Sequence, residues 1–577
     1  MKRFSIYFMS LLMASSGFTA CSLDEVNKSS LDSGSYFTGE TQYEQLVSEA
    51  YLTMRPLMRI TIPMWYGTDL YECQGSTSAS DARTPTNDYT VMNGDEYLDY
   101  WNNCYNVIAK VNTALTRGEN IPDISEETKK LRTAELKALR AFCYFNLVEN
   151  FGKVPVVLAE SSEAIYNFTQ ESEETIYTQI LQDLNDAIND LPDNANNSDT
   201  KNFGRVTKGF VYHMLAKVYL TRSYKSFGNK TEDLKSTITN ADKALALHPV
   251  STDPKAWEIM FDDYGDEHST FKQNTPEIIF SIRYSTNQTY NGSWGTENTT
   301  WGNNLYQEFK FELEKLACGS VIAGPYWRCQ YTYQPTKLYL NELFDGNDVR
   351  GSEQFLQRHI VAAETDENYP NIQVGDEIIY CPRTAMTEAE KAAYKAQNPS
   401  VLWIVNPNEY HEYLSGTIYN GFPIVWKFFD SGIQEYTNDQ RDPKGTRDTY
   451  VFRSAETLLL KAEALVQQGN GSSMDATTLI NQLRDRAGAD RLTTAATIDD
   501  VLDESARELF GEANRWMDLK RTGKLFERAW KYNAWIQKHH SSVSDISDIY
   551  LLRPIPISEI SYSNYSLIQN PGFPGAK

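Results

Sequence analysis

The residues of this chain best suited to recognition chemistry are aromatic rings interleaved with amides. Between Tyr284 and Gln307 the one charged side chain is Glu297, and Tyr290, Trp294, Trp301 and Tyr306 alternate there with asparagines and a glutamine. Aromatic planes offer flat apolar faces to the C–H groups of a sugar, and amides exchange hydrogen bonds with its hydroxyls. The pattern predicts a binding surface for a neutral carbohydrate. The alternative is a polar loop held in place by buried rings.

Two further aromatic clusters are candidates for the same role. Tyr326, Trp327, Tyr331 and Tyr333 precede the string PTKLYLNELF, and Trp65, Tyr66 and Tyr71 lie in an early segment flanked by Pro63 and Gly67. Large aromatic side chains also dominate hydrophobic cores. Packing in the core is therefore the alternative to ligand stacking for each of these rings.

The charged residues form no recognisable catalytic arrangement. Arg507, Glu508, Arg515 and Asp518 resemble an acid–base cluster, but their spacing on a helix equally suits structural ion pairs. The chain contains no GxSxG, P-loop or GxGxxG motif. We therefore predict that the protein is not an enzyme and uses no cofactor.

Metal binding is not predicted either. His411 has no second histidine at the helical spacing that a zinc hydrolase needs. Asp345, Asn347 and Asp348 in FDGNDVR could suggest calcium, but the rest of a calcium-binding loop is missing, and we expect a turn there.

The first 20 residues predict a secretory signal. Lys2 and Arg3 precede an apolar run over residues 4–13, and small residues lead to Ala20 and then Cys21. A signal that ends in small residues before cysteine resembles the bacterial lipoprotein pattern, which predicts lipidation of Cys21. The alternative is ordinary cleavage near Ala20. No later apolar run reaches the roughly 20 residues of a membrane-spanning helix.

Composition excludes disorder for most of the chain and makes nucleic acid an unlikely partner. The 577 residues include 36 Tyr, 25 Phe and 11 Trp, and 77 acidic residues against 54 basic ones give a formal charge of −23. Six cysteines follow Cys21 without any CxxC spacing, so their pairing stays open. Cys143 lies on an apolar helical face and is predicted to be a buried free thiol.

Apolar side chains at three- and four-residue spacing predict antiparallel helix pairs. The predicted pairs are residues 131–150 with 174–191, a helix after Thr207 with one ending before Pro249, and 453–468 with 474–487. Repeated pairs with small residues at their contacts favour a tetratricopeptide-like superhelix. Residues 250–450 instead predict loops and short strands, such as residues 277–282, mounted on this scaffold.

Several strings together resemble the SusD/RagB family of outer-membrane nutrient-binding lipoproteins. They are LRTAELKALRAFCYFNLVENFGKVPVV, RVTKGFVYHMLAKVYL, RSAETLLLKAEALVQQG, INQLRDRAG, ARELFGEANRWMDLKRTG, YLLRPIPISEI and QNPGF, in that family's order. The resemblance spans Cys21 to the C-terminus, although residues 280–450 match in outline alone. It implies a mainly α SusD-like fold with four tetratricopeptide-like pairs and loop-rich, short-strand insertions.

The resemblance also implies a function. It points to a cell-surface lipoprotein, anchored in the outer membrane, that binds a glycan oligosaccharide and delivers it to a SusC-like TonB-dependent transporter. A peptide-binding importer would share the scaffold strings, and a glycoside hydrolase stays open because 77 acidic residues could supply a carboxylate pair. We expect a signal peptide over residues 1–20, an N-terminal helical part over 21–250 and a C-terminal part over 251–577, in one integrated body.

Overall fold

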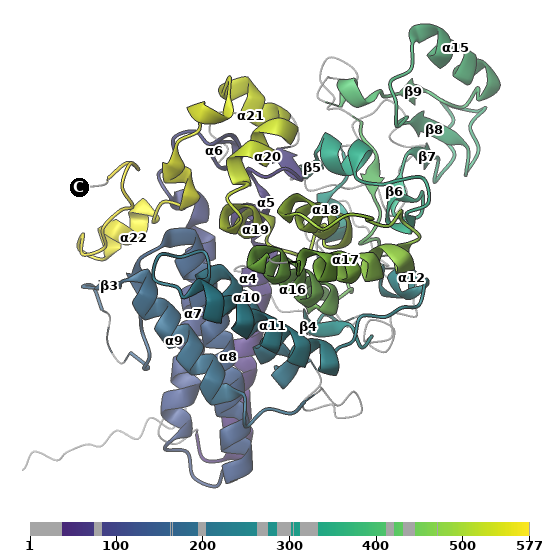
Figure 1. Ribbon diagram of the computed structural model, residues 1–577. Helices are drawn as coiled ribbons and strands as arrows, with labels where there is room; N and C mark the ends of the chain where they lie inside the picture. The colour runs from purple at the N-terminus through teal and green to yellow at the C-terminus, as the bar shows by residue number, and fades with distance from the viewer. Residues whose placement is uncertain are drawn as a thin grey trace, which may run out of the picture.

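The computed structural model of the chain describes residues 37–73, 83–161, 163, 165–193, 204–261, 275–285, 302–303, 305–311, 333–410, 421–430, 445–469 and 471–575. Helices dominate these residues, and the strands are short (Figure 1). The long helices between residues 98 and 187 lie at the lower left of Figure 1, and the short elements between residues 359 and 404 lie at the upper right.

A central helix organises the N-terminal part. Helix α8 (Glu126–Phe151) packs against α7 (Leu98–Gly118), which in turn packs against α3 (Glu40–Leu52). The Ser125 hydroxyl accepts the N–H of Thr128 at the start of α8, and Gly152, with φ +71°, ends it. Every residue from 138 to 151 is buried. The C-terminal half of α8 is therefore enclosed on all sides and lies in the interior of the protein.

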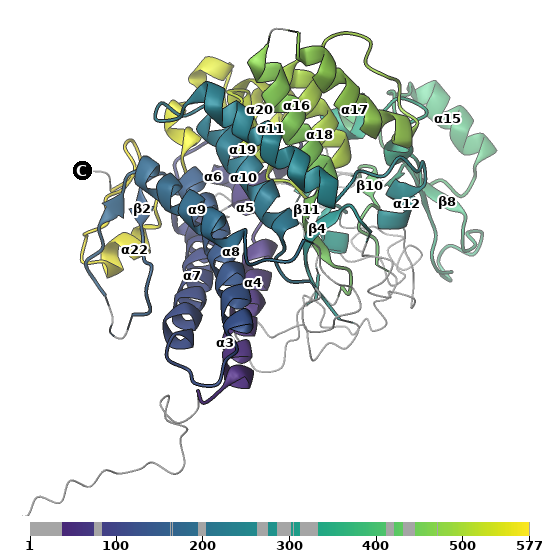
Figure 2. The same cartoon turned by 60° about the horizontal axis from the view of Figure 1, so that its bottom comes forward.

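The predicted helix pairs are present. Helix α8 pairs with α9 (Glu173–Ala187), α10 (Lys208–Arg222) pairs with α11 (Lys230–Leu247), and α16 (Ser454–Gln468) pairs with α17 (Ser473–Ala487). Helix α11 also packs against α16, so the late pair continues the stack of the early ones (Figure 2). Residues 250–450 therefore form an insertion between two neighbouring layers of the scaffold.

Short elements make up this insertion, as predicted. They are α12 (Ala256–Phe261), β4 (Ile278–Ile282), α13 (Leu305–Glu308), β5 (Tyr333–Pro335), a π-helical turn (Leu338–Glu342), β6 (Leu356–Gln357), β7 (His359–Val361), β8 (Glu377–Tyr380), α15 (Glu388–Gln397), β9 (Trp403–Ile404) and β10 (Ile424–Val425). Strand β4 is wholly buried and pairs antiparallel with β11 (Thr449–Arg453), which leads directly into α16. This ladder joins the insertion to the scaffold.

The remaining α-helices and strands lie before or after the insertion in the sequence. They are α4 (Met54–Arg59), α5 (Ile62–Trp65), β1 (Tyr71–Cys73), α6 (Arg83–Asp88), β2 (Val154–Pro155), β3 (Gln170–Glu171), α18 (Ile498–Glu508), α19 (Arg515–Arg521), α20 (Leu525–Tyr532), α21 (Ala534–His539) and α22 (Ile557–Tyr562). Helix α19 packs on α5, α21 packs on α6, and β1 pairs with β5 of the insertion. The C-terminal helices thus cover the N-terminal segment.

The described cysteines are all buried. Cys104, Cys143 and Cys381 are free thiols, which confirms the prediction for Cys143, and burial raises the pKa of Cys143. Cys318 and Cys329 lie outside the described residues, so their pairing stays open. In the part of the chain that the structure describes, no helix combines the length and hydrophobicity needed to cross a bilayer.

Candidate functional site

The predicted stacking residues fall into two groups in the structure. Six of them and the predicted lipidation site lie outside the described residues, namely Tyr290, Trp294, Trp301, Tyr326, Trp327, Tyr331 and Cys21. The others, Trp65, Tyr66, Tyr71, Tyr306 and Tyr333, are described, and all are buried.

Trp65, Tyr66 and Tyr71 are core residues. Their exposed fractions are 1%, 0% and 1%. The rings of Trp65 and Tyr71 stack with centroids 5.1 Å apart and an interplanar angle of 17°, and the Tyr333 ring contacts all three. In this structure these rings offer no face to a sugar. Of the two readings that the sequence leaves open for this cluster, the geometry is that of core packing.

Hydrogen bonds from the C-terminal part fix this aromatic cluster. The Trp65 indole N–H donates to the carbonyl of Ala513 over 3.1 Å, and the Tyr71 hydroxyl accepts the N–H of Gly511 over 2.7 Å. Gly511 has φ +76°, and a Cβ there would lie 2.3 Å from the Phe428 ring. Glycine is therefore required at the point where the backbone meets the rings.

The charged residues of the family-like string ARELFGEANRWMDLKRTG form a buried network. Arg350 binds Asp348 at 2.8 Å, Glu504 at 2.7 Å and Glu508 at 3.0 Å. Arg453 also binds Glu508, at 3.1 Å. Burial by itself would raise the pKa of Glu508, but the surrounding guanidinium groups outweigh burial and lower it to about 2. These contacts are structural ion pairs, in agreement with the expected role of the string.

The acidic string FDGNDVR forms a turn. One Asp345 carboxylate oxygen accepts the N–H groups of Asn347 and Asp348, both at 3.0 Å, and the other accepts that of Asp490 at 2.9 Å. Asp348 faces Arg350 instead of a shared centre. Backbone donors and a guanidinium thus occupy the carboxylates that a calcium ion would need.

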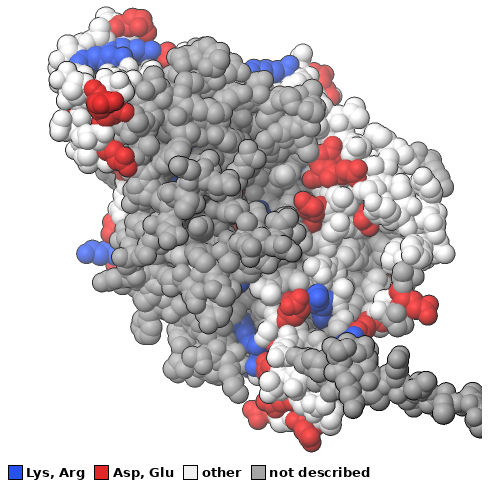
Figure 3. Space-filling model, turned by 180° about the vertical axis from the view of Figure 1, so that it is seen from behind, with Lys and Arg blue, Asp and Glu red and all other residues white. Residues whose placement is uncertain are grey.

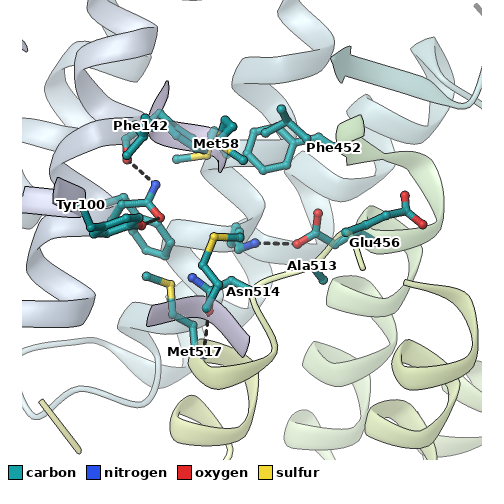
Figure 4. A pocket seen from close by; sticks show the side chains of 16 residues that line it. Met58, Tyr100, Phe142, Phe452, Glu456, Ala513, Asn514 and Met517 are labelled. Carbon is teal, nitrogen blue, oxygen red and sulfur yellow. Dashed lines mark hydrogen bonds and ion pairs between the residues drawn. The ribbon is translucent and has the colours of Figure 1, made fainter. Parts of the chain in front are cut away.

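A small cavity lies at the junction of the helical layers. The rings of Tyr100, Phe142 and Phe452 and the side chains of Met58 and Met517 line it (Figure 4). Its volume is about 30 Å³, which accommodates about one water molecule. The cavity is too small for a sugar.

A larger groove, here called the Trp101 groove, lies between α7, the segment 155–168 and α22. Its volume is about 390 Å³, within the range of small-molecule sites. Its lining residues include the aromatic side chains Trp101, Tyr105 and Phe168 and the carboxylates of Glu160 and Glu559. Aromatic and carboxylate side chains together are of the kind that bind the C–H groups and hydroxyls of a sugar.

Local contacts hold the Trp101 groove in shape. The Tyr105 hydroxyl donates to the carbonyl of Pro155 over 2.8 Å, and the Trp101 and Tyr105 rings lie 5.1 Å apart. Glu160 is paired with Arg117 at 2.7 Å. Burial, and then the charge of Asp95, raise the pKa of Glu559. Glu559 therefore provides a half-buried carboxyl that can accept a hydrogen bond from a hydroxyl.

The sequence did not indicate the Trp101 groove. Trp101 and Tyr105 have the four-residue spacing of an ordinary core-facing helix stripe, and nothing local identifies Phe168 as their neighbour.

On the face opposite to that of Figure 1, red Asp and Glu side chains are scattered over the described surface, and blue side chains show at the lower margin of the grey region (Figure 3).

Sequence comparisons relate the chain to known proteins. The sequence model described as the SusD family matches residues 276–573, and one described as starch-binding associating with outer membrane matches residues 23–220. The chain is 24% identical over 487 residues to the starch-binding protein SusD of Bacteroides thetaiotaomicron, covering 81% of this chain and 76% of that protein. It is 25% identical over 471 residues to SusD-like protein P38 of Formosa agariphila, covering 76% and 75%.

Solved structures share the fold. A SusD homolog from Bacteroides thetaiotaomicron matches with a TM-score of 0.69 and 20% identity, over 93% of this chain and 98% of that one. Surface glycan-binding protein A from the same organism, in complex with laminarihexaose, matches with a TM-score of 0.64 and 20% identity, over 92% and 100%. These matches confirm the predicted mainly α, SusD-like fold.

Proposed function

Since the chain belongs to the SusD family, we propose that it is a glycan-binding protein of the outer membrane that passes oligosaccharides to a transporter. The observation that carries this proposal is the family match over residues 276–573, together with similarity to the starch-binding protein SusD over 81% of the chain. Structures of a laminarin-binding SusD-like protein and of a laminarihexaose complex share the fold and support the same ligand class.

Two features of the chain support sugar as the ligand. The segment 286–301 carries Tyr290, Trp294 and Trp301 among amides, and the segment 312–332 carries Tyr326, Trp327 and Tyr331. The Trp101 groove adds a described site with ring faces and carboxylates. We assign stacking to the six rings of the two segments and keep the Trp101 groove as a second position for a sugar.

The proposal includes an anchor and a partner. Cys21 follows a signal-like segment and is proposed to carry the lipid that holds the protein at the cell surface. The partner is proposed to be a SusC-like TonB-dependent transporter. Gentle solubilisation of membranes should recover the two proteins together, and recovery of this chain alone in several mild detergents would contradict the partnership.

Glu508, in the buried charged network, does not suit the role of general acid in a glycoside hydrolase. Glycoside hydrolysis needs a protonated carboxyl as general acid beside a second carboxylate. Glu508 has a pKa of about 2 and is therefore ionised at neutral pH, and Glu504 and Glu512 are each paired with basic side chains.

A binding screen tests the proposal against its alternatives. The purified chain without residues 1–20 should bind at least one oligosaccharide on a glycan array and release no reducing ends from polysaccharides. Selective capture of peptides would favour a peptide importer, and new reducing ends would favour a hydrolase. For the Trp101 groove, Phe168→Ala should weaken binding if a sugar occupies the groove, whereas Tyr212→Ala should not, because half-buried Tyr212 on α10 lines no described groove.

A further inference from the structure

A second groove, here called the arginine groove, lies between α3 and α4 on one side and β4 with its exit on the other. Its volume is about 290 Å³. Its polar lining consists of Ser48, Tyr51, Arg55, Arg205, Ser281 and Arg283. All three charged side chains among the described residues that line it are arginines, in a chain whose net charge is −23.

The three guanidinium groups are held in place. Arg205 binds Glu135 and Glu44, each at 3.1 Å, and lies 5.1 Å from the centre of the Tyr51 ring. Arg283 forms an ion pair with Asp448. Fixed guanidinium groups lose little conformational freedom when they bind a ligand.

Arg55 joins the two walls of the groove. Its guanidinium donates to the carbonyl of Arg283 over 2.8 Å and lies 5.5 Å from the centre of the Tyr284 ring. Arg55 on α4 therefore reaches the main chain of Arg283 on the opposite wall. Guanidinium groups from both walls of one groove can bind an anion that accepts several hydrogen bonds.

Two of the three carboxylates that pair with these arginines are more deeply buried than the arginines. The side chains of Glu135 and Asp448 are each 2% exposed, whereas those of Arg205 and Arg283 are 14% and 20% exposed. The third, Glu44, is 27% exposed and is also paired with Arg132 at 2.8 Å. No acidic side chain is among the described residues that line the groove, so a ligand entering it contacts guanidinium groups.

We propose that the arginine groove binds a negatively charged substituent of the glycan, a carboxylate or a sulfate ester. Guanidinium forks match the paired oxygens of both groups. The inference rests on the proposed glycan-binding function and narrows its substrate to acidic oligosaccharides.

The test compares acidic and neutral ligands on wild type and Arg55→Gln. Arg55 is chosen because its guanidinium donates to a backbone carbonyl, whereas removing Arg283 or Arg205 would leave a buried carboxylate without its partner. The ligands are oligogalacturonate for carboxylate, a sulfated galactan oligosaccharide for sulfate, maltohexaose as the neutral arm and an acidic hexapeptide. Arg491→Gln is the matched control, since Arg491 is 63% exposed and lies outside the groove.

The expected result is that at least one acidic oligosaccharide binds and that Arg55→Gln weakens its binding by about tenfold or more. Neutral binding should not change, Arg491→Gln should behave as wild type, and added salt should weaken acidic binding alone. Arg55→Lys, which keeps the charge, should recover part of the affinity.

Three results would overturn the inference. They are neutral binding without acidic binding, acidic binding that Arg55→Gln leaves intact, and tighter binding of the acidic peptide. The first of these leaves the proposed glycan-binding function standing. Failure of every oligosaccharide to bind, with melting temperatures unchanged, would instead reject the proposed function itself.

Discussion

Asp69 and Arg515 form a buried, two-pronged ion pair across 446 residues of sequence, with Arg515 Nε 2.8 Å from Asp69 Oδ1 and Arg515 Nη2 2.7 Å from Asp69 Oδ2. Arg528 adds a third contact to Asp69 Oδ2 at 2.6 Å. Asp69 lies between Tyr66 and Tyr71 in the chain. The pair therefore fixes the aromatic segment of the N-terminal part against the C-terminal helices.

Replacing Asp69 by alanine should destabilise the fold by about 3 to 5 kcal/mol, because two buried guanidinium groups lose their shared partner. Chemical denaturation measures this free energy. Asp345→Ala in an exposed turn is the control and should cost less. A loss below about 1 kcal/mol for Asp69→Ala would show that the pair does not hold the segment.

The effect of Asp69 should depend on pH in a defined direction. Burial would raise its pKa, but Arg515 and Arg528 outweigh burial and lower it from 3.8 to about 2. The ionised carboxylate therefore stabilises the fold above pH 3.8, by about 2 kcal/mol, and this contribution is lost as the pH falls through 2.

The stability difference between wild type and Asp69→Asn should accordingly shrink as the pH falls from about 4 towards 2. Unfolding free energies of the two proteins across this range provide the measurement. A difference that stays constant with pH would show that folding does not lower the pKa of Asp69.

Replacing Trp65 by alanine should lower stability by about 3 to 5 kcal/mol and leave ligand affinity unchanged, because its ring is enclosed by Tyr71, Phe309 and Tyr333. Thermal melting and titration with a bound oligosaccharide separate the two effects. Weaker binding at unchanged melting temperature would show instead that the Trp65 ring contacts the ligand.

The sequence predicted the scaffold well because helix formation depends on local spacing. The apolar stripe of residues 131–150 and the glycine after it are visible in the chain, and α8 has these features. Helix α15 was not predicted, although Thr387 and Glu390 form a capping box, because none of its residues is buried and its apolar stripe consists of alanines instead of large aliphatic side chains.

The sequence could not separate the core aromatics from ligand aromatics. Trp65 looks like a loop residue between proline and glycine, and its burial depends on Ala513 and Tyr333, which are remote in sequence. The arginine groove could not be predicted from the sequence for the same reason, because its lining residues come from α3, α4 and β4, which are remote from one another in the chain. Short sequence segments predict helices and strands, whereas a binding groove depends on which helices and strands pack against each other.

Replacing Cys21 by alanine should release the protein from the outer-membrane fraction while it stays folded, since a lipid on Cys21 would supply the proposed anchor. Membrane fractionation and detergent partitioning provide the measurement. Cys143→Ala, at a buried free thiol, is a control that should leave fractionation unchanged. Retention of the Cys21→Ala protein in the membrane would contradict lipidation.

The most direct test of glycan binding is calorimetric titration of the mature protein and of Trp294→Ala, Trp327→Ala and the double variant with the oligosaccharide that binds best. We predict a Kd between about 1 μM and 1 mM for wild type, a loss of about two- to tenfold for each single variant and no measurable binding for the double variant. Failure of every glycan to bind the folded wild-type protein, or unchanged affinity in the double variant at unchanged melting temperature, would contradict the account.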